Sequence, residues 1–118
     1  MIMIVDDNEA ILEAFSMALS EFGFEVYAQS TVSDAICKTI KQKAPDVLIL
    51  DLLLAGGNGA DIAKKLKTDK QTRHIPIIIV SAHPDARERA KGAGADMFLE
   101  KPCDIDVLIG SVSRYTQP

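Results

Sequence analysis

The stretch Val47-Leu48-Ile49-Leu50-Asp51 decides the fold, because four consecutive apolar residues run directly into a carboxylate. Pro45 cannot continue a helix into this stretch, and a short apolar run of this kind is typical of a strand buried on both faces. Ile2-Met3-Ile4-Val5 and Ile77-Ile78-Ile79-Val80 have the same character. We therefore predict three central strands of a parallel sheet.

Amphipathic stretches separate these runs and predict helices between the strands. Asn8 has the character of an N-cap, and apolar residues recur behind it at helical spacing until Gly23. We expect Ser30 or Thr31 to cap a second helix that already contains Val32. Further helices are predicted around residues 62–66, from Pro84 to about Lys91 and over residues 105–112, with a loop at residues 55–59.

Two further strands complete the pattern. Residues 24–29 alternate between apolar and polar side chains, which predicts a half-exposed edge strand, and residues 97–99 form the fifth strand. Strands that alternate with helices predict an α/β fold of (βα)₅ type, a doubly wound parallel five-stranded sheet with helices on both faces. We expect residues 1–118 to be a single domain without an effector domain, because this length fits one compact unit and no linker interrupts it.

Composition narrows the classes of function. The chain is 47% hydrophobic and 25% charged, with no apolar run that could cross a bilayer, so we expect no membrane contact. A net charge of −4 without a basic stripe argues against direct nucleic-acid binding. Cys37 and Cys103 match no zinc spacing, and residues 1–7 lack the basic region of a signal peptide. We expect reduced thiols in a cytoplasmic protein.

Polar residues stand where the predicted strands end. Asp6 and Asp7 follow the first strand, and Asp51 closes the third. Ser81 closes the fourth, and Lys101 follows the fifth. Each alone would more often be a turn, cap or surface residue. Because the carboxyl ends of the strands in a doubly wound sheet meet at one edge, the joint pattern indicates a site.

Three neighbouring carboxylates repel one another, by roughly 4 kcal/mol per pair at 4 Å and an effective dielectric constant of about 20. Such a cluster needs a cation or a proton, and hard oxygen ligands favour Mg²⁺ or Mn²⁺. Lys101 and Ser81 offer a positive charge and a hydroxyl donor to phosphoryl oxygens. The set therefore suits in-line phosphoryl transfer, with Asp51 as the nucleophile.

The sequence at this point resembles the response-regulator receiver domain of two-component signalling, over essentially the whole chain. The matching segments are Ile4-Val5-Asp6-Asp7, Val47-Leu48-Ile49-Leu50-Asp51-Leu52, Asn58-Gly59, Ile77-Ile78-Ile79-Val80-Ser81-Ala82, Gly94-Ala95-Asp96 and Lys101-Pro102. The resemblance implies a flavodoxin-like three-layer sandwich with strand order 2-1-3-4-5. It also implies that Asp51 is phosphorylated by a histidine kinase or by a histidine phosphotransfer protein of a phosphorelay.

The resemblance further assigns roles to single residues. It implies that Mg²⁺ is held by Asp51, by Asp7 directly, by Asp6 mostly through water and by the backbone carbonyl of Leu53. The domain would catalyse only its own phosphorylation and dephosphorylation, so it would not be an enzyme in the usual sense. Its output partner or effector domain and its oligomeric state stay open, and Val107 stands where one DNA-binding subfamily uses an acidic residue for dimer pairing.

The switch is implied in the same way. Ser81 would bind the phosphoryl group and draw its loop inward, while Lys101 pairs with that group and the Lys101–Pro102 bond is cis. Phe98 occupies the position of an aromatic residue that rotates inward, although plain packing is the alternative. Leu53, bulky and apolar, is expected to slow hydrolysis of the phosphoryl group, and Gly56 is expected to loosen the loop after Asp51.

Two other functions are worth weighing. A degenerate receiver that acts only as an interaction domain would have lost part of the set, yet all five strand-end residues are present. A small-molecule α/β enzyme or nucleotide binder is suggested by Gly56-Gly57-Asn58-Gly59, but this spacing fits neither the dinucleotide fingerprint nor the P-loop. A phosphorylation-dependent switch is therefore the reading that we carry forward.

Overall fold

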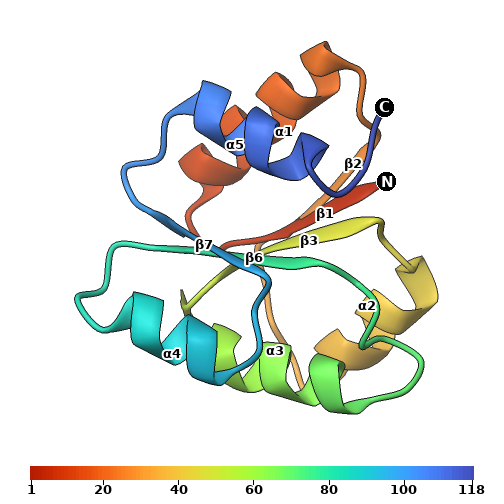
Figure 1. Cartoon of the computed structure of the whole chain (residues 1–118), viewed down its shortest axis with the longest axis vertical. Helices are drawn as coiled ribbons and strands as arrows, with labels where there is room; N and C mark the ends of the chain where they lie inside the picture. The colour runs from red at the N-terminus through yellow and green to blue at the C-terminus, as the bar shows by residue number, and fades with distance from the viewer.

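In the computed structural model, which describes residues 1–118, five parallel strands form one sheet covered by helices on both faces (Figure 1). The order of these strands is β2-β1-β3-β6-β7. The strands are β1 (Ile2–Val5), β2 (Val26–Gln29), β3 (Val47–Asp51), β6 (Ile77–Ser81) and β7 (Met97–Glu100). The predicted α/β class and parallel five-stranded sheet are confirmed, with the predicted edge strand at one end and the predicted central strand in the middle.

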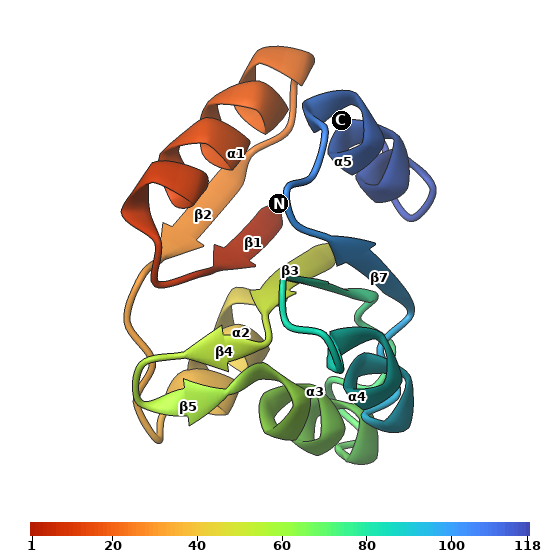
Figure 2. The same ribbon diagram turned by 90° about the vertical axis from the view of Figure 1, so that its left-hand side faces the viewer.

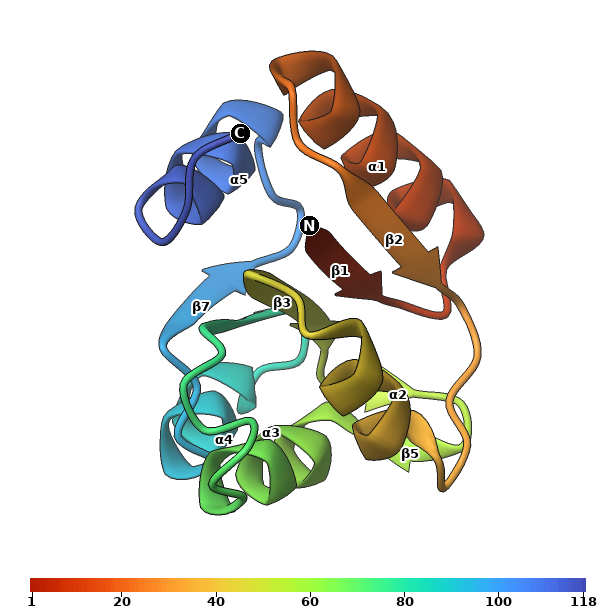
Figure 3. The same ribbon diagram turned by 90° about the vertical axis from the view of Figure 1, so that its right-hand side faces the viewer.

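The helices form the two outer layers. α1 (Glu9–Phe22) and α5 (Ile105–Ser113) cover one face of the sheet (Figure 2). α2 (Ile36–Lys43), α3 (Gly59–Thr68) and α4 (Ala86–Gly92) cover the other (Figure 3). Asn8 caps α1 through its side chain and Gly23 ends it in the left-handed conformation, as predicted. None of these helices combines the length and the apolar character needed to cross a membrane.

The central strands are buried along their whole length, and alternate residues feed two separate cores. Met3, Leu48 and Ile77 belong to the core beneath α2, α3 and α4. Ile4 and Ile49 belong to the core beneath α1 and α5. Successive side chains of a strand point to opposite faces, so a continuous apolar run is what a strand between two helical layers requires. β3 and β6 end in the buried polar residues Asp51 and Ser81, so polar groups begin where the apolar runs stop, at the carboxyl edge of the sheet.

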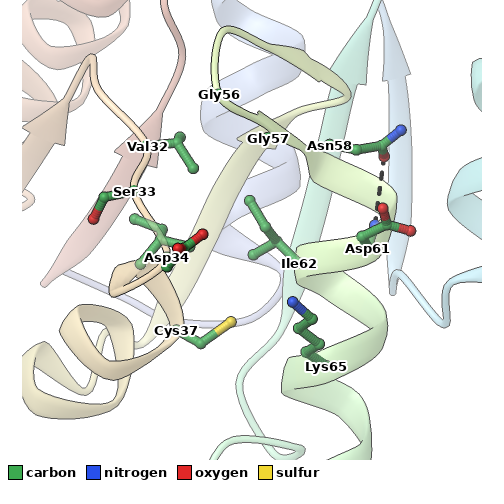
Figure 4. Close-up of a pocket in the computed structure, with 11 residues that line it drawn as sticks. Val32, Ser33, Asp34, Cys37, Gly56, Gly57, Asn58, Asp61, Ile62 and Lys65 are labelled. Carbon is green, nitrogen blue, oxygen red and sulfur yellow. Dashed lines mark hydrogen bonds between the residues drawn. The ribbon is translucent and has the colours of Figure 1, made fainter.

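The start of the second helix was predicted wrongly. α2 begins at Ile36 with Ala35 as its N-cap, and no side chain caps it. Val32 lies before the helix, beside the chain turn at Gly57, on a hollow of about 200 Å³ between α2 and α3 (Figure 4). A Cβ atom on Gly57 would lie only 2.9 Å from Cγ1 of Val32. Glycine thus leaves room for Val32 here, and a turn in which the hydroxyl and carbonyl oxygens of Ser33 accept from the N–H groups of Ala35 and Ile36 precedes the helix.

The segment after Asp51 also departs from the prediction of a plain loop. β4 (Leu53–Leu54) and β5 (Gly57–Asn58) pair as a small antiparallel hairpin, which was not predicted. Gly59 is already the first residue of α3, and the Asn58 side chain caps that helix. A Cβ atom on Gly59 would lie 2.0 Å from the carbonyl oxygen of Asp51, so glycine permits this close approach.

The fourth helix is shorter than predicted. α4 begins at Ala86, two residues after Pro84, because Pro84 and Asp85 form a turn. The backbone N–H of Ala86 donates to the carbonyl of His83 at 3.1 Å and closes that turn. Ala86 and Ala90 are the buried residues of α4, so this short helix fixes itself to the sheet through small side chains.

Candidate functional site

Three aspartates gather at the carboxyl ends of β1 and β3. Asp6 follows β1, Asp51 ends β3, and both are buried, with 3% and 7% of their surface exposed. Asp7 is exposed beside them. One carboxylate oxygen of each residue lies within 4.8 Å of the others. The sheet thus brings together residues that lie far apart in the sequence.

Lys101 is the cation of this cluster. Its Nζ atom lies 2.9 Å from Oδ2 of Asp6 and 3.3 Å from Oδ2 of Asp51. Its backbone N–H donates to the carbonyl of Ser81 at 3.0 Å, which ties the segment after β7 to the end of β6. The peptide bond between Lys101 and Pro102 is cis. One ammonium group therefore contacts two of the three clustered carboxylates.

The pKa of Asp51 reflects its burial and the charged groups around it. Burial raises the pKa of this carboxyl above its ordinary value, and the neighbouring charge of Asp6 raises it further. The ammonium group of Lys101 lowers it, but the net direction is upward. Burial and the charge of Asp6 thus disfavour the charged carboxylate, and a divalent cation beside it would favour that charged form.

Backbone groups fix the carboxylates in place. The N–H of Asn8 donates to Oδ1 of Asp6 at 2.9 Å, and the N–H of Ala55 donates to Oδ2 of Asp7 at 3.1 Å. The second bond joins the β4–β5 hairpin to the acidic cluster. Sequence reasoning missed Ala55, because a backbone donor leaves no signal in residue type. It also missed the packing role of Gly59, which the Asn58-Gly59 segment had marked only by resemblance.

Ser81 ends β6 and is buried, with 2% of its surface exposed. Its hydroxyl oxygen accepts a hydrogen bond from the backbone N–H of His83 at 3.2 Å. In the β6–β7 register, Val80 lies opposite Leu99, and Ile79 lies opposite Phe98. Ser81 therefore stands at the carboxyl edge, while Phe98 is partly buried two residues back along the neighbouring strand.

The residues suit a divalent cation by their donor chemistry. Asp6, Asp7 and Asp51 offer hard carboxylate oxygens, of the kind that bind Mg²⁺. Leu53 lies two residues beyond Asp51, in β4, with its side chain half exposed. Its carbonyl as a further ligand stays a prediction.

The amino-acid sequence is similar to those of known response regulators. Residues 2–113 match the response regulator receiver domain family. The chain is 35% identical over 122 residues to the phosphate regulon transcriptional regulatory protein PhoB of Pseudomonas aeruginosa, covering 99% of this chain and 53% of that protein. It is 32% identical over 118 residues to the response regulator PleD of Caulobacter vibrioides, covering 98% of this chain and 26% of that protein.

A solved structure agrees. The response regulator signal receiver domain from Bermanella marisrubri superposes with a TM-score of 0.85 at 27% identity, covering 97% of this chain and 95% of that one. The chain spans about half the length of PhoB and about a quarter of PleD. The match nonetheless extends over nearly all of this chain, so the protein belongs to the response regulator receiver domain family, a family of signalling domains controlled by phosphorylation.

Proposed function

We propose that this receiver domain is a switch in which Asp51 accepts a phosphoryl group from a phosphohistidine. The donor is a histidine kinase or a histidine phosphotransfer protein, and the product addresses an output partner or effector domain through an altered surface. The observation that carries the proposal is the placement of Asp51, buried between Asp6 and Lys101 at the carboxyl edge of the sheet.

Asp6, Asp7, Asp51 and the carbonyl of Leu53 are the groups that would hold Mg²⁺ or Mn²⁺. When bound, the cation neutralises the clustered carboxylates and the charge on the phosphoryl oxygens. The exposed position of Asp7 leaves the site open to solvent, so the cation can enter after folding. Because the protein supplies few ligands, places remain for water and phosphoryl oxygens.

The protein's own groups perform the transfer. A carboxylate oxygen of Asp51 attacks phosphorus, the new P–O bond forms, and the P–N bond to the donor histidine breaks. The electron pair of that bond returns to the imidazole. Lys101, whose Nζ atom already lies 3.3 Å from Asp51, contacts a phosphoryl oxygen. Ser81 donates its hydroxyl hydrogen to another, while the oxygen of that hydroxyl can still accept from the N–H of His83.

The proposal is tested by titrating beryllofluoride, a stand-in for the phosphoryl group, into the protein with Mg²⁺ and following heat by calorimetry. We expect saturable binding that disappears without Mg²⁺ and in Asp51→Asn. Asp61→Asn is the matched control, because Asp61 is an exposed aspartate of α3 outside the acidic cluster. Binding that survives in Asp51→Asn, or no binding at all, would contradict the proposal and favour a domain that acts only by interaction.

A further inference from the structure

The side chain of Arg87, on α4, lies over the ring of Phe98, on β7. The guanidinium carbon is 4.9 Å from the ring centroid, within the range of a cation–π interaction. No carboxylate lies within 4.0 Å of this guanidinium group, although Glu100 lines the same hollow. The aromatic ring is therefore the partner that holds Arg87 in place.

Phe98 also borders the segment that follows Ser81. A hollow of about 90 Å³ is lined by His83, Pro84, Arg87, Phe98 and Glu100. The N–H of His83 is bonded to the hydroxyl oxygen of Ser81, so a displacement of Ser81 would also move His83, which lines this hollow. The ring of Phe98 is the aromatic group that faces the change.

The ring of Phe98 packs against the core, but open space also adjoins it. Arg87 and Phe98 line a second hollow of about 320 Å³, whose other residues are Ala90, Lys91, Ala95, Asp96 and Met97. Close-packed interiors resist a shift of one side chain, whereas a ring between two hollows can change position at low cost. Its contact with Arg87 is then the interaction that such a shift has to break.

We propose that Arg87 is a positioning residue: it holds Phe98 in the arrangement seen here and so opposes the change that phosphorylation of Asp51 brings about. The inference rests on the proposed function. An exposed cation–π contact shifts a two-state equilibrium by roughly two- to fivefold. A ligand that favours the other state binds more weakly by the same factor while the contact stands.

The first test follows the NMR signals of the Arg87 side chain in the 118-residue protein. Nuclei above an aromatic face are shifted upfield, so the Cδ protons of Arg87 should be shifted upfield and should lose this shift in Phe98→Leu. Adding beryllofluoride and Mg²⁺ should abolish the shift. A shift that persists while signals around Asp51 move would overturn the proposal.

The second test measures the affinity for beryllofluoride in the presence of Mg²⁺. Arg87→Gln should bind roughly two- to fivefold more tightly than the unsubstituted protein, and Arg87→Lys should stay close to it. Lys43→Gln is the matched control, because it removes a cation–π contact of 4.3 Å to Tyr27, on the opposite edge strand. It should leave the affinity unchanged. Unchanged or weaker binding in Arg87→Gln would overturn the proposal.

Different results would contradict the proposed function and the role of Arg87. If the unsubstituted protein binds no beryllofluoride, or Asp51→Asn binds it equally well, the proposed function fails and the inference falls with it. If binding depends on Asp51 but the Arg87 shift persists, or Arg87→Gln does not bind more tightly, the inference alone fails.

Discussion

The charged groups at the two ends of the parallel strands are paired differently. At the amino ends, Lys67 pairs with Asp96, and the amino group of Met1 pairs with Asp46. At the carboxyl ends, three carboxylates gather, and Lys101 contacts two of them. At the amino edge, which we call the balanced edge, each of these pairs joins one cation to one carboxylate. At the carboxyl edge, the unbalanced edge, the clustered carboxylates outnumber the cation beside them. This difference teaches where the molecule gives up stability in order to bind a cation and a phosphoryl group.

The balanced edge is held by one well-partnered cation. Nζ of Lys67 lies 2.8 Å from Oδ2 of Asp96 and donates to the carbonyls of Ile75 and Arg73 at 2.8 and 3.2 Å. The same Oδ2 atom accepts from the backbone N–H of Ile77 at 2.8 Å. This group joins the end of α3 to the starts of β6 and β7.

The largest expected effect is at this edge. Lys67→Met should lower the free energy of unfolding by about 1–2 kcal/mol, because Asp96 and two carbonyls lose their donor. Chemical denaturation measures the change. Lys41→Met removes an exposed ion pair with Asp69 and should lower the free energy of unfolding by less than Lys67→Met does, because solvent screens that pair. Equal losses in the two variants would show that the amino edge is not specially stabilised.

The opposite sign is expected at the carboxyl edge. Asp51→Asn should raise the free energy of unfolding of the metal-free protein by about 1 kcal/mol, because it removes a buried charge beside Asp6. Denaturation in a chelator measures this, and adding Mg²⁺ should stabilise the unsubstituted protein more than the variant. The exposed control Asp61→Asn should instead be destabilised by a few tenths of a kcal/mol, since Asp61 stands in the first turn of α3. A destabilised Asp51→Asn would remove the contrast between the edges.

A smaller effect concerns pH. The pKa of Asp51 is raised in the folded protein above its ordinary value of 3.8, so the folded state binds this proton more tightly than the unfolded chain does. The metal-free protein should therefore gain stability relative to Asp51→Asn as the pH falls through the raised pKa. The gain is complete below the ordinary value and is lost as the pH rises past the raised one. Melting temperatures of both proteins across this window measure it, and a constant difference would contradict it.

The smallest expected effect is kinetic. Leu53 is 50% exposed, an apolar side chain two residues beyond Asp51. Leu53→Asn should shorten the lifetime of the phosphorylated protein by a few-fold, because a polar group there can hold the attacking water that leucine excludes. Loss of phosphate from the purified phosphoprotein measures the rate. Val107→Asn, equally exposed but on α5, is the control, and an unaltered rate in Leu53→Asn would reject the role given to Leu53.

The unbalanced edge was the part of the molecule most open to prediction. Asp6, Asp51 and Ser81 each end a buried apolar run, so the class of sheet alone brings them to one place. The position of Val32 outside the helix and the β4–β5 hairpin were not predicted. Val32 and the hairpin lie against each other in the fold, and the residue pattern of neither segment indicates this. The contact between Arg87 and Phe98 was not predicted either, because it joins a helix to a strand that lies elsewhere in the sequence. Residue patterns report burial and periodicity, and they are silent on which side chains meet across elements.

The most direct test of the central claim locates the phosphoryl group itself. The protein is incubated with acetyl phosphate and Mg²⁺, the acyl phosphate is reduced with borohydride, and peptides are mapped by mass spectrometry. The account predicts reduction of Asp51 alone, dependent on Mg²⁺ and abolished by Asp6→Asn together with Asp7→Asn. Modification of another residue, or equal modification in the presence of a chelator, would contradict it.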